Sequence, residues 1–296
     1  MRVKSALIIG MDGLVGGSLL RLFRAKGIRT YGTTRRRPTH SSDIYLDLSD
    51  RDLARVSLPQ TDVAIICAAA NGFAYCRFNP EVATQVNIDG PRILSHKFAS
   101  QGTRTIYLSS SAVFDFSRPL IKTSSPHCPS TIYGRSKAAG EDTVLVAGEL
   151  ATIVRLTKVL SPDTTLFREW IGALGSGRKI FAFSDLHFCP ISLDYAANAV
   201  LAITEANFSG IFHVSGATDI SYFEAALHLA KRVACDNSKV IKDRAFARGI
   251  PRDEIAMYTS LDASRYTALG GEVAPQPLDV IDAVYGPIIV NATAEP

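Results

Sequence analysis

The chain has 296 residues, of which 47% are hydrophobic and 20% are charged, and its formal net charge is +4. This composition is typical of a globular protein and excludes the disordered and fibrous classes. Basic residues are scattered apart from the run at 35–37, which argues against a nucleic-acid-binding surface, and no apolar stretch approaches the roughly 20 residues that a membrane span needs.

Strand patterns alternate with helical patterns over the first half of the chain. The short apolar runs typical of buried strands lie at 5–10, 28–34, 62–70, 103–111 and 150–156. The helical patterns lie at 14–27, 80–102 and 130–147. This alternation indicates an α/β, Rossmann-like fold, a doubly wound parallel sheet with helices on both faces. Ligands of such sheets bind at the carboxyl ends of the strands.

The alternation weakens after Leu156. A helical pattern and then a strand pattern return to the sheet, whereas the rest of this half has helices and few strands. We therefore predict a dinucleotide-binding domain and a smaller, interleaved C-terminal substrate-binding lobe. The first is formed by 1–158 and 193–215, and the second by 159–192 and 216–290.

The first turn of the predicted sheet, IIGMDGLVGG, has three glycines spaced G-x-x-G-x-x-G between a strand and a helix. Glycine allows the backbone to turn tightly and to approach a pyrophosphate, and the helix amino terminus supplies N–H groups and a positive dipole. The pattern predicts dinucleotide binding, with a purely structural turn as the alternative. The expected cofactor contacts here are Gly10, Asp12, Gly13, Leu14, Val15 and Gly16.

The end of the second strand indicates which dinucleotide is bound. An NAD enzyme usually has an acid there to bond the ribose 2'-hydroxyl, whereas a 2'-phosphate favours arginine. Arg35 and Arg36 have planar guanidinium groups that suit a phosphate, so we expect NADPH in preference to NAD. A solvated basic loop is the alternative. Asp47 and Leu48 are expected to border the adenine, although a helix cap by Ser49 or Asp50 would explain the same residues.

Two segments bring hydroxyl and amine groups to one edge of the predicted sheet. One strand ends in three serines, 109–111, and the next helix begins with Tyr133 and Lys137. A tyrosine with a pKa near 10 is a poor acid or base at neutral pH, but a nearby ammonium favours the phenolate. A serine hydroxyl can hold a carbonyl oxygen while the tyrosine moves a proton. The pair is therefore a catalytic candidate, although residues four apart share a helix face whatever they do.

Together these features resemble the extended short-chain dehydrogenase/reductases of the NAD-dependent epimerase/dehydratase family. Within it, the chain is most similar to nucleotide-sugar reductases of the dTDP-4-dehydrorhamnose reductase type. The likeness covers nearly the whole chain and includes the glycine turn, AAA at 68–70, VNIDGPRIL, SSSAVFD, PSTIYGRSKAAGE, CPISLDYAANAV and TSLDASRYTALGG.

The resemblance implies a role for each matching residue. Tyr133 would be the proton donor, and Lys137 would bind the nicotinamide ribose and lower the pKa of the tyrosine. Ser110 takes the position of the family's catalytic serine or threonine. The other cofactor contacts that we expect are Ala68, Ala69, Ala70, Asn87 and Ser109. Asn87 is expected to fix the backbone near the cofactor rather than to perform chemistry.

A nucleotide sugar is the substrate that the resemblance implies. The residues that we expect to contact it are Ser111, Lys158, Trp170 and Arg178. Ser111 stands at a position that is often acidic in the rhamnose-pathway enzymes, which argues against a 4,6-dehydratase. Trp170 has core packing as its alternative, and Arg178 has a solvated loop.

Three functions fit these residues. The first is NADPH-dependent reduction of a nucleotide-linked 4-keto sugar. The second is a nucleotide-sugar 4-epimerase with bound NAD, which uses the same residues. The third is a non-catalytic NADP-binding regulatory subunit, which the complete set of serine, tyrosine and lysine disfavours. Apolar residues on more than one face of the helices around Asn87 and Tyr133 predict a homodimer.

The cysteines and the amino terminus indicate a cellular compartment, and the spacing of the histidines bears on metal binding. Five cysteines without a C-x-x-C pair favour reduced thiols over a disulfide framework or a zinc site. The apolar run at 6–9 is too short for the core of a signal peptide. We therefore expect a cytoplasmic protein without a nucleic-acid or membrane partner, and no metal site among the histidines at 40, 127, 187 and 213.

Overall fold

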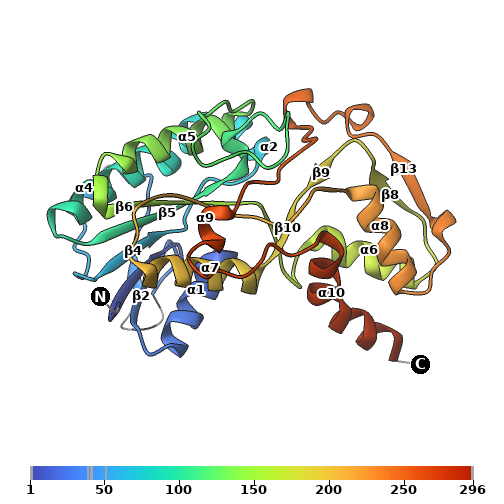
Figure 1. Cartoon of the computed structure of the whole chain (residues 1–296), viewed down its shortest axis with the longest axis horizontal. Helices are drawn as coiled ribbons and strands as arrows, with labels where there is room; N and C mark the ends of the chain where they lie inside the picture. Colours follow the sequence, from blue (N-terminus) through green and yellow to red (C-terminus); the bar gives the residue numbers. More distant parts are fainter. Residues whose placement is uncertain (1–2, 39, 41–42, 51, 295–296) are drawn as a thin grey trace.

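The computed structural model of the protein describes residues 3–38, 40, 43–50 and 52–294. A seven-stranded sheet dominates the amino-terminal half (Figure 1), and every neighbouring pair of its strands is parallel. The strand order is β11-β6-β5-β4-β1-β2-β3. The strands are β1 (Ser5–Ile9), β2 (Arg29–Thr34), β3 (Asp43–Tyr45), β4 (Val63–Ile66), β5 (Arg104–Ser110), β6 (Ala151–Leu156) and β11 (Gly210–Val214).

Helices cover both faces of this sheet (Figure 1), which is why every residue of β1, β4 and β6 is buried. On one face lie α1 (Leu14–Ala25) and α7 (Leu193–Ala206). On the other lie α4 (Gly90–Ser100) and α5 (Ile132–Leu145). Two short helices, α2 (Phe73–Phe78) and α3 (Pro80–Thr84), and a π-helical turn (Gln85–Asp89) lead into α4. The predicted Rossmann-like, doubly wound fold is confirmed.

The strand order reverses between β1 and β4, and the loops after these two strands lie together. Gly10 follows β1, and a Cβ atom built on it would lie 2.8 Å from the Cβ of Ala68, which follows β4. Ligands of doubly wound sheets bind at this reversal. The topology therefore places the predicted glycine turn and the AAA segment at the edge where a dinucleotide is expected.

The carboxyl-terminal half contains a second body with its own apolar core (Figure 1). Its larger elements are α6 (Thr165–Gly175), β8 (Ile180–Phe183), α8 (Tyr222–Arg232), β13 (Val240–Asp243) and α10 (Pro277–Ala294). Short strands form the pairs β7 (Lys158–Leu160) with β10 (Pro190–Ser192) and β9 (His187–Phe188) with β12 (Ile220–Ser221). The short helix α9 (Ser264–Thr267) packs against β11. The sequence did not indicate these four strands, because two or three residues are too few to show a periodic pattern.

The proposed domain division agrees with how the chain returns to the sheet. β11 pairs with β6, and α7 packs against α1, so 193–215 lies with the first domain as the division requires. The division itself stays a proposal. Among the described residues, no helix is both long and apolar enough to cross a membrane.

The surfaces of α4 and α5 bear on the predicted homodimer. Their apolar residues are buried or partly buried, because both helices pack against the sheet and against each other. The exposed positions on the two helices are Arg92, His96, Ser100, Arg135 and Asp142. The apolar residues that are not buried are partly exposed, and the homodimer stays a prediction.

Candidate active site

The turn from β1 to α1 requires glycine at two positions. Gly10 has a φ angle of 90°, a conformation that side chains disfavour. A Cβ on Gly16 would lie 2.2 Å from the carbonyl oxygen of Gly10, which is too close for any side chain. The Gly13 N–H donates to the same carbonyl at 3.2 Å and precedes the first residues of α1, Leu14 and Val15. The turn thus leaves a bare backbone before the amino terminus of α1, as anion binding needs.

The glycine turn is tied to the end of β2, where the predicted arginines begin. The Thr34 hydroxyl donates to the Asp12 carboxylate at 2.5 Å, and the Arg36 N–H donates to the Thr34 hydroxyl at 2.9 Å. The side chains of Arg35 and Arg36 are exposed. Both guanidinium groups therefore follow β2 directly and are accessible to a ligand at this edge.

Asp47 and Leu48 follow β3, and both already contact other residues of this chain. The N–H and hydroxyl of Ser49 donate to Asp47 at 2.9 and 2.7 Å, so Asp47 closes a local turn. The helical turn that follows, Leu53–Arg55, begins after Asp52, so neither Ser49 nor Asp50 is its cap. Burial raises the pKa of Asp47, but the hydrogen bonds from Ser49 and the charge of Arg35 outweigh it and lower that pKa. Leu48 is 5% exposed and packs against Gly90, whose lack of a side chain leaves room for it.

Asn87 fixes the loop after β4. Its side-chain amide donates to the Ala70 carbonyl at 2.9 Å and accepts from the Ala70 N–H at 2.8 Å. The same amide nitrogen donates to the Ser136 hydroxyl on α5 at 2.9 Å. Asn87 is fully buried within the π-helical turn, so its side chain holds the backbone of the AAA segment, 68–70, against α5.

The first turn of α5 is held against the end of β5. The Thr131 hydroxyl caps the helix by accepting the Gly134 N–H at 3.0 Å. A Cβ on Gly134 would lie 2.0 Å from the carbonyl oxygen of Ala112, so only glycine allows this approach. Tyr133 is therefore brought close enough to Ser110 for the serine side chain to influence the pKa of the tyrosine.

Tyr133 lies in apolar surroundings that the sequence did not indicate. Its ring is 5.9 Å from the ring of Phe73, which is 6.0 Å from that of Phe116. Leu186 packs into the same cluster. These residues come from separate segments without a shared periodicity, so no sequence signal identified them. Burial raises the pKa of Tyr133 to about 12, and the hydrogen bond with Ser110 only partly opposes this.

The Lys137 side chain is 2% exposed and packs against β5. Its Nζ atom donates to the Leu108 carbonyl at 2.7 Å and lies 3.8 Å from the centre of the Tyr107 ring. Burial lowers the pKa of Lys137 to about 7, against the opposing charge of Glu141. The expectation that Lys137 lowers the pKa of Tyr133 is therefore not met in this structure, because the burial of both groups disfavours their charged forms.

A buried ionic cluster lies one helical turn beyond Lys137. Arg155 on β6 donates to the Glu141 carboxylate on α5 through Nε at 3.0 Å and Nη2 at 2.7 Å. His127 Nε2 lies 2.9 Å from Glu141, and His213 Nε2 lies 3.3 Å from Arg155. Hydrogen bonds from His127 and Arg155 overcome the effect of burial and lower the pKa of Glu141 to about 2. The described residues contain no group of three or more His, Cys, Asp or Glu side chains that could hold a metal ion.

One of the residues expected to contact the substrate lies next to a catalytic candidate, and a second lies just beyond the end of β6. Ser111 is 8% exposed in the turn that follows β5, next to Ser110. Lys158 is exposed at the start of β7, two residues beyond the end of β6. The hydroxyl of the predicted cofactor contact Ser109 is buried, and it has no hydrogen-bond partner of good geometry among the described residues.

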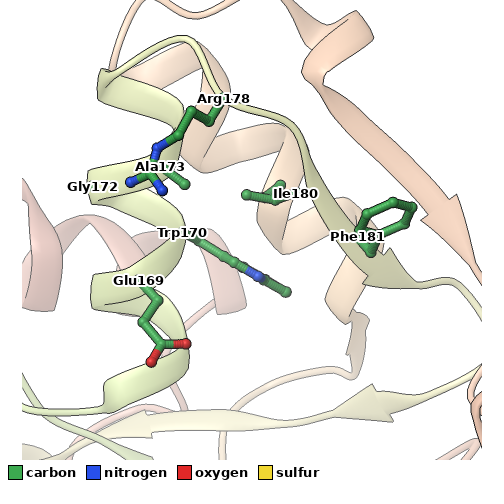
Figure 2. A pocket seen from close by; sticks show the side chains of 7 residues that line it. All are labelled: Glu169, Trp170, Gly172, Ala173, Arg178, Ile180 and Phe181. Carbon is green, nitrogen blue, oxygen red and sulfur yellow. The ribbon is translucent and has the colours of Figure 1, made fainter.

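Trp170 and Arg178 line a different hollow, of about 560 Å³, between α6 and β8. Figure 2 shows Trp170 extending from α6 toward β8, with Arg178 alongside the same helix. This hollow shares no lining residue with the apolar surroundings of Tyr133. Trp170 is 6% exposed, and its ring lies 5.6 Å from that of Phe167, so the structure favours core packing over contact with a nucleotide.

Known proteins are similar to this chain in sequence and in fold. The family model described as the RmlD substrate binding domain matches residues 4–279. The dTDP-4-dehydrorhamnose reductase of Mycobacterium tuberculosis is 30% identical over 76% of this chain and 76% of its own. Methionine adenosyltransferase 2 subunit beta of Xenopus tropicalis is 27% identical over 77% of this chain and 71% of its own.

A solved structure extends this comparison to the fold. The structure of dTDP-4-dehydrorhamnose reductase from Bacillus anthracis in complex with NADP has a TM-score of 0.82 at 20% identity. The match covers 97% of this chain and 100% of that one. The two proteins therefore share one architecture over their whole length.

Proposed function

Because this chain belongs to the RmlD substrate binding domain family, we propose that it is an NADPH-dependent reductase of a nucleotide-linked 4-keto sugar. Its membership confirms the predicted class, an oxidoreductase of the extended short-chain dehydrogenase/reductase type. The observation that carries the proposal is the close packing of the first turn of α5, which contains Tyr133, against the turn after β5, which Ser110 caps. Lys137 follows on the next turn of α5.

The residues at the β1–β4 edge fit the dinucleotide. The bare backbone around Gly10 and Gly16 is a cradle that any Cβ atom would fill, and the amino terminus of α1 follows it. Arg35 and Arg36 bind the 2'-phosphate through their exposed guanidinium groups. The NADP complex of the Bacillus anthracis reductase supports this choice of cofactor. When bound, NADPH supplies the hydride that the carbonyl carbon accepts.

The side chains of this site move the proton and hold the oxygen. With a pKa of about 12, Tyr133 stays protonated at neutral pH and is ready to donate its proton to the nascent alkoxide. Ser110 holds the substrate oxygen beside the Tyr133 hydroxyl. Lys137, on the turn after Tyr133, would bind the nicotinamide ribose through its amine.

Two other functions remain as alternatives. The similarity to methionine adenosyltransferase 2 subunit beta, which is named as a subunit, makes the non-catalytic NADP-binding regulatory subunit our second candidate. Such a protein needs no complete catalytic set, whereas Ser110, Tyr133 and Lys137 are all present here. A 4-epimerase would use the same three residues but would keep NAD bound through its reaction, so the cofactor found in the purified protein separates it from a reductase.

A ligand screen followed by an activity assay tests the proposal. Ligands that bind the native state raise its melting temperature by mass action. We expect NADPH, together with one dTDP-, UDP- or GDP-linked sugar, to raise it most, and we expect the matching 4-keto sugar to be reduced as NADPH is consumed. Binding of NADPH without turnover of any 4-keto nucleotide sugar would favour the regulatory subunit.

A further inference from the structure

The Lys137 amine occupies a site that offers few partners for a charge. An ammonium group has three N–H donors, yet among the described residues the only hydrogen-bond acceptor recorded for Nζ is the Leu108 carbonyl, at 2.7 Å. Burial of a charge is unfavourable unless neighbouring groups compensate for it. The face of the Tyr107 ring is the other close partner, with its centre 3.8 Å from Nζ.

Tyr107 is locked in this position. Its side chain is completely buried on β5, and its hydroxyl donates to the Asn87 carbonyl at 3.0 Å. A Cβ on Gly140 would lie 2.6 Å from the Tyr107 hydroxyl oxygen, so the absence of a side chain on α5 makes room for it. The ring therefore presents a fixed face to the amine rather than a contact that forms only at times.

We propose that Tyr107 is a positioning residue whose ring face holds the amine of Lys137 in its charged form by a cation–π interaction. An aromatic face attracts a cation through its quadrupole, and this attraction is strongest where water is excluded. Only the role assigned to Lys137 in binding NADPH rests on the proposed function. The contact between ring and amine is a property of this chain alone.

The other titratable groups around Lys137 do not replace the ring. Glu141 on α5 favours the ammonium form, but its carboxylate is hydrogen-bonded to Arg155 and His127. Charge interactions with Cys67, after β4, and Cys76, on α2, also act on the pKa of Lys137. Burial raises the pKa of Cys67 to about 12 and raises the pKa of Cys76 as well.

The two tyrosines near Lys137 are neutral at physiological pH. Burial raises the pKa of Tyr133 to about 12 and that of Tyr107 well above its usual value. The Tyr107 ring is therefore a close partner of Nζ, at 3.8 Å, that is not itself bound to another charge.

The test is an NMR titration of Lys137 in the full-length protein without ligand. Its Cε resonance in lysine-labelled protein is assigned by its absence from Lys137→Met. Tyr107→Phe keeps the ring and should keep the protonation midpoint. A second variant carries a trifluorinated phenylalanine at position 107 in place of phenylalanine. Its ring has nearly the same shape but a weak quadrupole. Its midpoint should fall by roughly 0.4 to 1.5 on the pH scale, a change of about two- to thirtyfold in the protonation equilibrium.

Equal midpoints in the two phenylalanine variants would overturn the proposal, because they would show that the ring fills space without holding the charge. Since the two variants differ only in fluorine, a general loss of stability cannot imitate the expected shift. The titration uses no cofactor or substrate, so its outcome is independent of the reductase assay. If the midpoint shifts but NADPH does not bind, the proposed function fails and the proposal for Tyr107 stands.

Discussion

Glu141 and Arg155 form an ion pair that is almost completely withdrawn from solvent. Arg155 Nη2 lies 2.7 Å from Glu141 Oε2, and the two side chains are 1% and 0% exposed. The pair joins α5, which contains Tyr133 and Lys137, to the neighbouring strand β6. The position of the proposed catalytic helix therefore depends on a pair of charges that water cannot replace.

Glu141→Gln should lower the free energy of unfolding by about 3 to 5 kcal/mol, because it leaves the Arg155 charge buried without its partner. The double variant Glu141→Leu/Arg155→Leu should recover much of that loss. Asp52→Asn, which breaks the exposed pair with Arg55, is the control and should change stability by no more than about 0.5 kcal/mol. Urea unfolding measures all three. If Glu141→Gln were as stable as the wild type, the buried pair would not hold α5 against β6.

The glycine turn gives a steric prediction. Gly16→Ala should destabilise the protein and weaken NADPH binding, because its Cβ would lie 2.2 Å from the Gly10 carbonyl oxygen and force the turn apart. Gly172→Ala on α6 is the matched control, since nothing lies within 4 Å of its added Cβ and alanine favours helices. Thermal unfolding with and without NADPH compares the two. Equal behaviour would mean that the turn tolerates a side chain.

Arg35 is expected to select NADPH over NADH. Removing a charge-assisted contact to the 2'-phosphate, worth about 1.5 to 3 kcal/mol, should reduce the preference roughly ten- to a hundredfold in Arg35→Ala. Arg37→Ala is the control, because Arg37 is also exposed in this loop but was not assigned to the site. Titration of both cofactors gives the affinity ratio. An unchanged ratio in Arg35→Ala would remove Arg35 from the site.

Lys137 predicts an unusual pH dependence of stability. Its folded pKa of about 7 lies below its ordinary value of 10.5, so the unfolded chain binds more protons between these values. The lysine therefore destabilises the fold below about pH 7, and the penalty fades as the pH rises toward 10.5. Lys137→Met should stabilise the protein more at pH 6 than at pH 9.

Urea unfolding at pH 6 and pH 9 measures this difference. Lys179→Met is the control because Lys179 is exposed, and its effect should be small at both values. A stability gain in Lys137→Met that is the same at both values would show that Lys137 is not held as a buried amine with a lowered pKa.

The sequence predicted the parts of this protein that periodicity and local motifs determine. The parallel sheet and the glycine turn follow from apolar runs and from the requirement for glycine at Gly10 and Gly16. The closeness of Ser110 to Tyr133 also follows, because β5 and α5 deliver their ends to one edge.

What the sequence could not predict comes from contacts between distant segments. Glu141, Arg155, His127 and His213 lie on four different segments, and no spacing indicates that they meet. The tyrosine–lysine motif predicts a lowered pKa for Tyr133, whereas the structure raises it. The motif does not show how deeply the surrounding chain buries both residues. Depth of burial depends on the whole fold, so its effect on pKa appears only in the structure.

The proton donor is the centre of the proposed mechanism, and Tyr133→Phe tests it most directly. The variant loses one hydroxyl but keeps the ring contact with Phe73, so it should fold and bind NADPH. The measurement is single-turnover oxidation of NADPH with the best 4-keto nucleotide sugar from the ligand screen. The rate should fall by roughly 10² to 10⁴, the usual contribution of a positioned general acid. A folded Tyr133→Phe enzyme with more than roughly a tenth of the wild-type rate would contradict the mechanism.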